Sequence, residues 1–406
     1  MTASPTLPAG FVAPSYAEDS LAAVLPAVAG ALGLDLTTST GLRSPDIARA
    51  LGLPSVRRAV VVLVDGLGLH NLSERGGHAP FLRGLLPDAR SLTSSVPSTT
   101  AAALATFGTG TPPGCTGLLG YTQRNPATGG LATMVSWTEQ SDPYRPGTKT
   151  AAPLRTDPAD LQREPTVLEQ VGAATTVVAP GPRKFAGSGM TRAALRGPRY
   201  VGAETFADRV DATVTALRDP GLVYLYQGDV DKTGHQHGPD SWQWGDALEA
   251  TDAELRRLVR SLPAGTLVLV TADHGQITSN LTRQHDVAER PELARDVALL
   301  GGEPRFTHVY ATPGADTAAV ADRWAGGLGD DALVVTRDAA IKAGWFGPVA
   351  DHVLPAVGDV LVAARGRATV VDSRLHPAAA RHMPGVHGSL TPEEMIVPLL
   401  VAEGTR

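Results

Sequence analysis

Six acidic or imidazole side chains stand in short motifs whose residue types suit the binding of metal ions. Three carboxylates and three imidazoles are enough for two sites with three protein ligands each, which leaves open positions for water and substrate. That pattern is typical of catalytic rather than structural metal sites, and it predicts two divalent ions. The motifs are Asp65-Gly66, Asp231-Lys-Thr-Gly-His235, Asp273-His274-Gly275 and His387-Gly388.

Each motif alone also has a structural interpretation. An Asp-Gly pair after a strand, such as Asp65-Gly66, is usually a turn, and Asp231 with His235 could lie on a solvated loop. Asp273-His274 is more specific, because two ionisable residues directly after a buried strand have little structural purpose. His387 alone is a weak signal. The joint pattern, rather than any single motif, favours a catalytic centre.

A hydroxyl-rich stretch supplies a candidate nucleophile. Small residues from Ala101 to Ala105 favour a helix, and Ser98 or Thr99 is a natural residue to cap it. A hydroxyl at a helix start lies at the positive end of the helix dipole, where backbone N–H groups bind phosphate oxygens. A divalent metal would lower the pKa of such a hydroxyl further. The alternative is that these threonines only cap the helix.

The elements that must position these residues follow from apolar runs. Continuous apolar runs suit parallel strands covered on both faces, and residues 240–262 repeat apolar positions at helical spacing. Strands alternating with helices predict an α/β fold, a mostly parallel doubly wound sheet with helices on both faces. Ligands of such sheets bind beyond the carboxyl ends of the strands. The predicted strands are residues 59–64, 174–179, 222–226, 266–270 and 397–402.

Two segments are predicted to be insertions into this core. Residues 121–172 are rich in Gly, Pro and Thr and predict a loop-rich cap. Residues 277–385 contain short strand candidates separated by polar turns and predict a small α+β lobe. The core then comprises residues 1–120, 173–276 and 386–406.

Composition limits the classes of partner. The chain has 406 residues and a net charge of −6, which argues against a surface that coats nucleic acid. An anionic substrate must therefore be attracted locally, by a metal or a helix terminus. The single cysteine, Cys115, excludes an internal disulfide framework.

Nothing in the sequence predicts a membrane anchor. The first twenty residues lack the Lys or Arg of a secretory signal. The apolar run at 21–34 is shorter than the ~20 residues that span a bilayer, and it is predicted to be a buried helix. A cytoplasmic protein is expected.

Taken together and in this order, the motifs resemble the alkaline phosphatase superfamily, and most closely its nucleotide pyrophosphatase/phosphodiesterase-like branch. The resemblance covers residues 59–120, 220–276 and 384–402. It implies an alkaline phosphatase-like core and a site for two divalent ions, normally Zn²⁺. One ion would be held by Asp65, Asp273 and His274, and the other by Asp231, His235 and His387.

The same resemblance implies a reaction. Its nucleophile position falls on Thr100, which would also bind the first metal, with Thr99 as the alternative. A small phosphate ester, a phosphodiester or a pyrophosphate, would be cleaved through a covalent phosphothreonine-type intermediate that water then hydrolyses. A phosphomonoesterase, a phosphomutase and a non-catalytic metal- or phosphate-binding homologue stay open as alternatives. A sulfatase is excluded, because Cys115 is not in a Cys-x-Pro-x-Arg motif.

The chain departs from the branch at positions that bear on substrate choice. Ala101 stands where a base-stacking Phe is usual, and Ala103 stands where an Asn usually holds a phosphate oxygen. These departures put nucleotide specificity in doubt. Tyr121 or Trp137 could replace the stacking residue, and Arg183 with Lys184 could bind a second anionic group, although packing and a solvated turn are the commoner roles for such residues.

Overall fold

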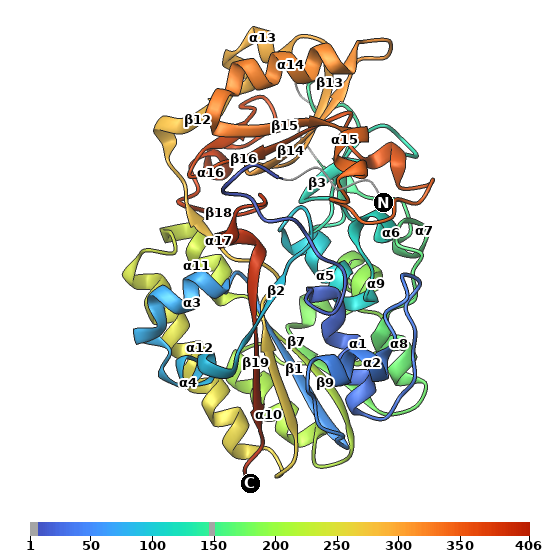
Figure 1. The fold of residues 1–406 in the computed structure, drawn as a ribbon, viewed down its shortest axis with the longest axis vertical. Coiled ribbons are helices and arrows are strands. Elements are labelled where there is room, and N and C mark those ends of the chain that lie inside the picture. Colours follow the sequence, from blue (N-terminus) through green and yellow to red (C-terminus); the bar gives the residue numbers. More distant parts are fainter. Residues whose placement is uncertain (1–6, 146–150) are drawn as a thin grey trace.

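The computed structural model describes residues 7–145 and 151–406, and its lower half is an α/β core built on one sheet (Figure 1). The sheet has seven strands in the order β2-β19-β10-β1-β9-β7-β8. Its middle is parallel, with β1 between β10 and β9, whereas β19 runs antiparallel to β10 and β2 antiparallel to β19. The strands are β1 (Arg58–Val64), β2 (Arg90–Thr93), β7 (Val177–Gly181), β8 (Arg199–Gly202), β9 (Gly221–Gln227), β10 (Leu267–Thr271) and β19 (Ile396–Glu403).

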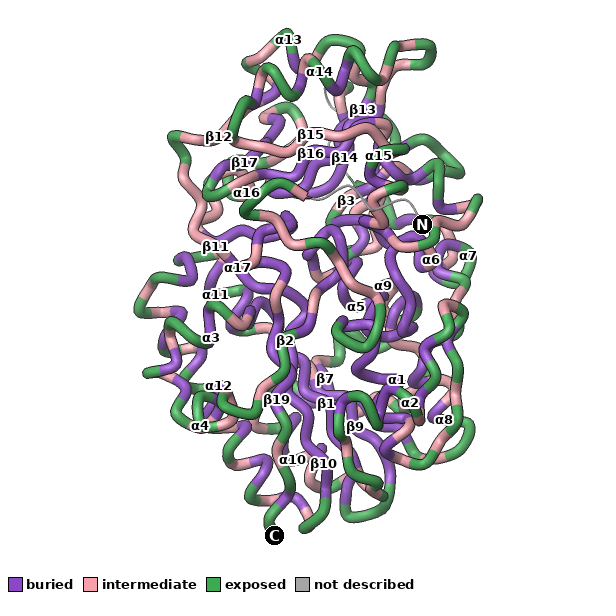
Figure 2. The backbone as a smooth tube through the Cα atoms, in the orientation of Figure 1, coloured by how far each residue is buried: buried purple, intermediate pink, exposed green. Residues whose placement is uncertain are grey.

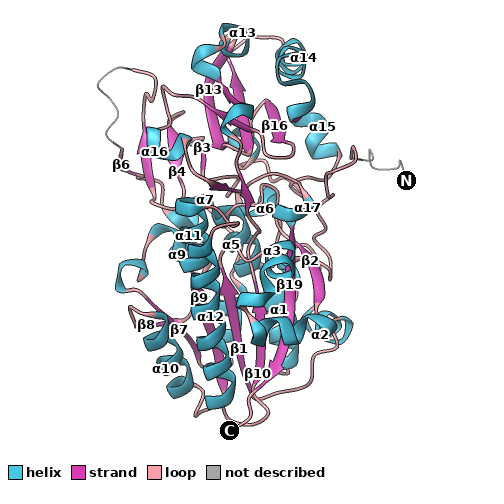
Figure 3. Cartoon of the chain, turned by 90° about the vertical axis from the view of Figure 1, so that its left-hand side faces the viewer, coloured by secondary structure: helices cyan, strands magenta, loops and turns pink. Residues whose placement is uncertain are grey.

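Helices cover both faces of this sheet, which confirms the predicted doubly wound architecture (Figures 1 and 3). One group comprises α3 (Leu69–Arg75), α4 (Pro80–Leu85), α10 (Phe206–Ala216), α11 (Asp229–His237) and α12 (Trp242–Ser261). The other comprises α1 (Val24–Ala31), α2 (Ser44–Ala50), α5 (Thr100–Thr109), α8 (Val167–Gly172) and α9 (Gly189–Ala194).

The upper half is a second sheet of eight strands, in the order β15-β16-β14-β13-β3-β4-β5-β6. Strands from both predicted insertions belong to it, since β13 pairs with β3 at Gly302 and Thr122. The strands are β3 (Thr122–Arg124), β4 (Leu131–Thr133), β5 (Thr138–Gln140), β6 (Ala152–Pro153), β13 (Val297–Glu303), β14 (Phe306–Ala311), β15 (Ala332–Thr336) and β16 (Val360–Ala364). We call this half the lobe.

The remaining helices and strands lie between and around the two sheets. Those of the lobe and its junction with the core are α6 (Pro113–Thr116), α7 (Pro158–Leu161), β11 (Ile277–Thr278), β12 (Gln284–Asp286), α13 (Pro291–Ala294), α14 (Thr317–Leu328), α15 (Arg337–Lys342), β17 (Thr369–Val371), α16 (Ala378–Arg381), β18 (Gly385–Val386) and α17 (Pro392–Met395).

Burial follows the sequence pattern (Figure 2). Six of the seven residues of β1 and all five of β10 are buried, as continuous apolar strands between two helical layers require. The predicted helix at 21–34 is a short 3₁₀ turn followed by α1, and seven of the eight residues of α1 are buried. Within the described residues, no helix has both the length and the apolar character needed to cross a bilayer. The prediction on the first twenty residues falls in part on residues 1–6, which lie outside the described residues.

Candidate active site

The first ligand group forms where two neighbouring parallel strands end. Asp65 follows β1, while Asp273 and His274 follow β10, so the strand pairing brings the three side chains to one edge of the sheet. His274 Nε2 lies 3.4 Å from Asp65 Oδ1 and 3.5 Å from Asp273 Oδ2. Gly66 turns the chain with φ +73°, and its N–H donates to Asp273 Oδ1 at 3.1 Å. A side chain at Gly66 would strike Asp231, so the turn needs glycine there.

The second ligand group lies beside the first. Asp231 and His235 are one turn apart on α11, and His387 follows β18. The Nε2 atom of His235 is 3.3 Å from Asp231 Oδ2, and that of His387 is 3.9 Å from Asp231 Oδ1. The rings of His274 and His387 stack with centroids 3.6 Å apart, so the two groups are in contact.

Each of the three imidazoles is held at its Nδ1 atom by a backbone carbonyl. The Nδ1 atoms of His235, His274 and His387 lie 2.9, 3.1 and 3.0 Å from the carbonyl oxygens of Gly385, Gly275 and Ser98. A carbonyl only accepts, so each Nδ1 carries a proton, and the neutral form of each imidazole has its Nε2 lone pair directed to its group of ligands. This is the tautomer and the outer-shell support that metal-binding histidines normally have.

Buried atoms without partners show that the residues fit metal ions. Asp65 Oδ1 and Asp273 Oδ2 have no hydrogen-bond partner within the described residues, although both are buried. Burial, and then the neighbouring carboxylates of Asp273 and Asp231, raises the pKa of Asp65 well above its ordinary value. Burial likewise raises the pKa of Asp273. Buried carboxylates so placed need a cation, and the donor atoms of each group lie within 4.8 Å of one another.

The candidate nucleophile stands at the start of α5. Thr100 is its first residue, and its Oγ1 lies 3.2 Å from His274 Nε2, directly beside the first ligand group. Thr99 occupies the cap position, and its side chain makes no cap hydrogen bond. Of the two threonines, Thr100 is the one whose hydroxyl lies within hydrogen-bond distance of a ligand residue, so the geometry favours Thr100.

A cavity of about 620 Å³ opens over both groups. Tyr226 lies in its wall and donates its hydroxyl hydrogen to Asp65 Oδ2, which leaves Oδ1 for a metal. Lys184 and Lys232 are exposed at the cavity and contribute positive charge to a wall that also contains the acidic Glu204. Other residues of its wall are Thr99, Thr100, Tyr121, Val135, Phe185, Phe206, Arg209 and Asp229.

Only some of the residues considered for substrate binding line the cavity. Tyr121 lines the cavity, and Lys184 does so next to Phe185, with its amine 4.9 Å from the ring centre. Trp137 does not line it: its indole N–H donates to the carbonyl of Thr156. Arg183 does not line it either, and faces Glu204 at 3.9 Å. The fully buried Ala101 and Ala103 offer neither a stacking surface nor a donor.

Sequence reasoning missed several supporting residues. Tyr226 and Gln276 each hold a ligand carboxylate, since the Gln276 amide donates to Asp231 Oδ1 at 2.5 Å. The only sequence signals were that Tyr226 stands near the end of β9 and that Gln276 directly follows Asp273-His274-Gly275. Glu303 comes from the lobe, far from any motif, so no sequence signal pointed to it.

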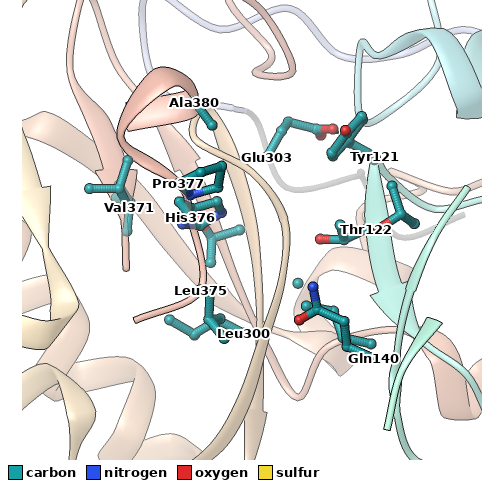
Figure 4. Close-up of a pocket in the computed structure, with 15 residues that line it drawn as sticks. Tyr121, Thr122, Gln140, Leu300, Glu303, Val371, Leu375, His376, Pro377 and Ala380 are labelled. Carbon is teal, nitrogen blue, oxygen red and sulfur yellow. Dashed lines mark hydrogen bonds between the residues drawn. The ribbon is translucent and has the colours of Figure 1, made fainter. Parts of the chain in front are cut away.

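A smaller cavity in the lobe adjoins the site (Figure 4). It has a volume of about 210 Å³, and Glu303 and Tyr121 lie side by side at one end of it. The N–H of Tyr121 donates to Glu303 Oε2 at 2.9 Å, and burial raises the pKa of Glu303 to about 8. Tyr121 lines both cavities, so the lobe contributes to the wall of the active site.

Comparisons with solved structures agree with this fold. Among solved structures, the chain is similar to murine ectonucleotide pyrophosphatase/phosphodiesterase 5, with a TM-score of 0.62 and 17% identity over 84% of this chain and 87% of that one. It is similar to phosphonoacetate hydrolase from Sinorhizobium meliloti 1021, with a TM-score of 0.65 and 21% identity over 90% and 93% of the two chains.

Curated relatives match only in part. Phosphopentomutase from Sinorhizobium medicae (strain WSM419) is 31% identical over 184 residues, which are 42% of this chain and 44% of that protein. The chain thus spans less than half the length of the curated relatives it matches. The profile of the type I phosphodiesterase/nucleotide pyrophosphatase family, in contrast, matches residues 59–390. The chain therefore belongs to this family.

Proposed function

We propose that the chain is a two-metal phosphohydrolase that cleaves phosphodiester or pyrophosphate bonds of a small phosphate ester, with Thr100 as its nucleophile. The observation that carries the proposal is the position of Thr100 Oγ1, at the start of α5 and 3.2 Å from His274 Nε2. A hydroxyl so placed adjoins both the ligand groups and the helix end that favours phosphate oxygens.

The side chains divide the work between binding and chemistry. Asp65, Asp273 and His274 would hold one ion, while Asp231, His235 and His387 would hold the other. Two Zn²⁺ ions, when bound, would supply Lewis acidity for the nucleophile and for the phosphate oxygens. Zinc suits these ligands because it is normally bound by imidazole nitrogens and carboxylate oxygens.

The covalent step takes place on the chain itself. Thr100 Oγ1 gives its proton to water and forms a bond to phosphorus, while the opposite P–O ester bond breaks in line and its electron pair departs with the leaving oxygen. Water then cleaves the phosphothreonyl ester and restores the hydroxyl. Lys184 and Lys232 at the cavity favour the entry of an anion into a chain whose net charge is −6.

Three other functions use the same centre. A phosphomonoesterase would differ only in preferring monoesters over diesters. The observation that supports a phosphomutase is the partial similarity to phosphopentomutases. A non-catalytic homologue is disfavoured, because all six ligand positions and the hydroxyl are present.

A substrate panel on metal-stripped and zinc-reloaded protein tests the proposal. We expect bis-p-nitrophenyl phosphate to be hydrolysed faster than p-nitrophenyl phosphate and p-nitrophenyl sulfate, and only after reloading. Preferred turnover of the monoester would establish a phosphomonoesterase. Transfer of phosphate within a pentose phosphate, without release of inorganic phosphate, would establish the mutase. If zinc-loaded protein turns over none of these esters, the result would support a non-catalytic homologue.

A further inference from the structure

A second, mostly apolar pocket opens directly beside the candidate nucleophile. It has a volume of about 320 Å³. Thr100 and Leu104 lie one turn apart on α5 and both line it, so the hydroxyl and the apolar wall share one helix face. The remaining apolar wall includes Ala179, Pro180, Phe185, Met190 and Leu195.

Resting on the proposed function, we infer that this pocket is a subsite for an apolar ester group of the substrate, an aryl or short alkyl group, rather than for a nucleoside. A substrate with this group is a phosphodiester of an apolar alcohol or phenol. Nothing else in the described cavities offers a comparable apolar surface next to Thr100.

The pocket is continuous with the cavity over the metal ligands. Val135, Pro182, Phe185 and Tyr226 line both, as does Thr100. A phosphorus atom bonded to Thr100 Oγ1 would therefore stand at the junction of the two cavities. One substituent of that phosphorus can then extend into the apolar pocket, while the charged oxygens stay with the ligand groups.

The charged side chains in the pocket wall are already bonded elsewhere. Arg192 donates to Asp157 at 2.7 Å, and Arg196 donates to Glu169 at 3.0 Å and to three backbone carbonyls. Their guanidinium groups are thus directed to protein partners, and their aliphatic stems are left for the pocket. This argues against a second phosphate as the occupant.

The hydroxyl groups of the wall are also engaged, with one exception. Tyr200 donates to the carbonyl of Pro182 at 2.7 Å, and Thr191 donates to the carbonyl of Phe185 at 2.8 Å. Tyr224 is the exception, because its buried hydroxyl has no partner within the described residues. The pocket thus offers one unused side-chain hydroxyl, which suits an apolar group carrying a single hydrogen-bond acceptor.

A nucleobase fits this wall poorly. A base carries several donors and acceptors, and burying them without partners costs free energy for each one. An apolar ring has no such groups and gains from leaving water. The size is suitable, because a cavity of ~150 Å³ already holds a benzene molecule. The buried Ala101 and Ala103 likewise provide nothing that would recognise a nucleotide.

The test compares p-nitrophenyl diesters that share a leaving group and differ in the retained ester: methyl, phenyl and thymidine 5′. We expect zinc-loaded enzyme to turn over the phenyl ester with a kcat/KM about tenfold or more above that of the methyl ester, because the ring is buried. We also expect the phenyl ester to exceed the thymidine ester. Equal kcat/KM for the phenyl and methyl esters, or preference for the thymidine ester, would overturn the subsite while leaving the hydrolase intact.

Variants at the rim of the pocket locate the effect without disturbing the core. Val135 is 44% exposed and Phe185 is 36% exposed, so Val135→Asp and Phe185→Ala should both fold. Each should lower the phenyl-to-methyl ratio of kcat/KM by about fivefold or more. The matched control is Val401→Asp, at a residue of β19 that is 41% exposed and lines neither cavity, and this variant should leave the ratio unchanged. An unchanged ratio in both rim variants would contradict the assignment.

A binding measurement separates failure of the subsite from failure of the function. If no diester is turned over, calorimetric titration of zinc-loaded protein with phenylphosphonate and methylphosphonate still tests the pocket. A dissociation constant for phenylphosphonate at least about tenfold lower than that for methylphosphonate would support the subsite, provided that the difference disappears in Val135→Asp. Equal affinities would overturn it.

Discussion

At the scale of single residues, the site depends on its candidate ligands and equally on the groups that hold those ligands in place. Each imidazole is fixed by a backbone carbonyl, and two carboxylates are fixed by Tyr226 and Gln276. These contacts set which oxygen or nitrogen of each ligand is free. Outer-shell contacts of this kind are commonly worth 10- to 100-fold in metal affinity.

Tyr226→Phe should therefore weaken zinc binding without unfolding the protein. The change removes the hydroxyl that donates to Asp65 Oδ2 and keeps the ring that packs near Phe185. We expect zinc affinity, measured by competition with a chelating dye, to fall by about 10-fold or more. Tyr200→Phe is the matched control, because that hydroxyl bonds only to a backbone carbonyl. Equal zinc affinity in Tyr226→Phe and wild type would show that the contact does not orient Asp65.

Glu303 should make stability depend on pH. Burial raises its pKa from 4.5 to about 8, so the folded chain holds a proton that the unfolded chain releases above pH 4.5. The stabilisation is fully present below pH 4.5 and is lost as the pH rises through 8. Between these two pH values, Glu303 should lower the free energy of unfolding of the metal-free protein by up to about 1.4 kcal/mol per pH unit. Glu303→Gln should remove this contribution. Urea unfolding from pH 5 to 8.5 measures it, and equal slopes in variant and wild type would contradict it.

Residue types and strand ends were enough to predict that the candidate ligands lie together, because parallel neighbours end at one edge of the sheet. Asp65, Asp273 and the α11 pair Asp231 and His235 needed no more than that rule. Phe185 and Glu303 could not be predicted in the same way. Phe185 lies in a turn and Glu303 in the lobe. Only tertiary packing brings Phe185 to the active-site cavity and Glu303 to Tyr121 in its wall.

At the scale of elements, a buried ion pair joins the lobe to the metal centre. Arg305 lies between β13 and β14, and Glu394 lies on α17; both are fully buried and bond at 2.7 and 3.1 Å. The backbone carbonyl of Glu394 also accepts from the N–H of Gly275, next to His274. The pair thus fixes the lobe to the loop that carries two ligands.

Arg305→Met should be strongly destabilising for this reason. It leaves the Glu394 carboxylate buried without its cation, which typically costs about 3–5 kcal/mol. Urea unfolding measures the change, and the double variant with Glu394→Gln should recover part of it. The exposed pair of Arg43 with Asp35 is the control, since removing it should cost less than about 1 kcal/mol. A similarly small cost for Arg305→Met would show that the pair does not hold the lobe.

The sequence also predicted most core elements but not how the lobe is assembled. Long apolar strands such as β1 and β10 have an unambiguous pattern, whereas β3, β4 and β5 have three residues each, too few to show alternation. Residues 121–172 were therefore expected to be loops. The antiparallel direction of β19 likewise depends on the path of the chain through the lobe rather than on its own residues.

At the scale of the whole molecule, the metal centre lies between two sheets and joins parts of the chain far apart in sequence. Without cations, three carboxylates of these parts crowd together in a chain whose net charge is already −6. Removal of metal should therefore lower the melting temperature of the protein, and zinc should restore it in a concentration-dependent manner. Scanning calorimetry measures this. Identical melting temperatures with and without chelator would indicate that no ion is bound.

The measurement that tests the central claim most directly is turnover of bis-p-nitrophenyl phosphate by zinc-loaded Thr100→Ala, with Thr99→Ala as the matched control. Thr100 Oγ1 lies 3.2 Å from His274 Nε2, whereas the Thr99 side chain at the cap position makes no cap hydrogen bond. We predict that Thr100→Ala loses at least about a thousandfold in kcat while keeping its zinc, and that Thr99→Ala retains most of its activity. Full activity of Thr100→Ala, or loss confined to Thr99→Ala, would contradict the assignment of the nucleophile.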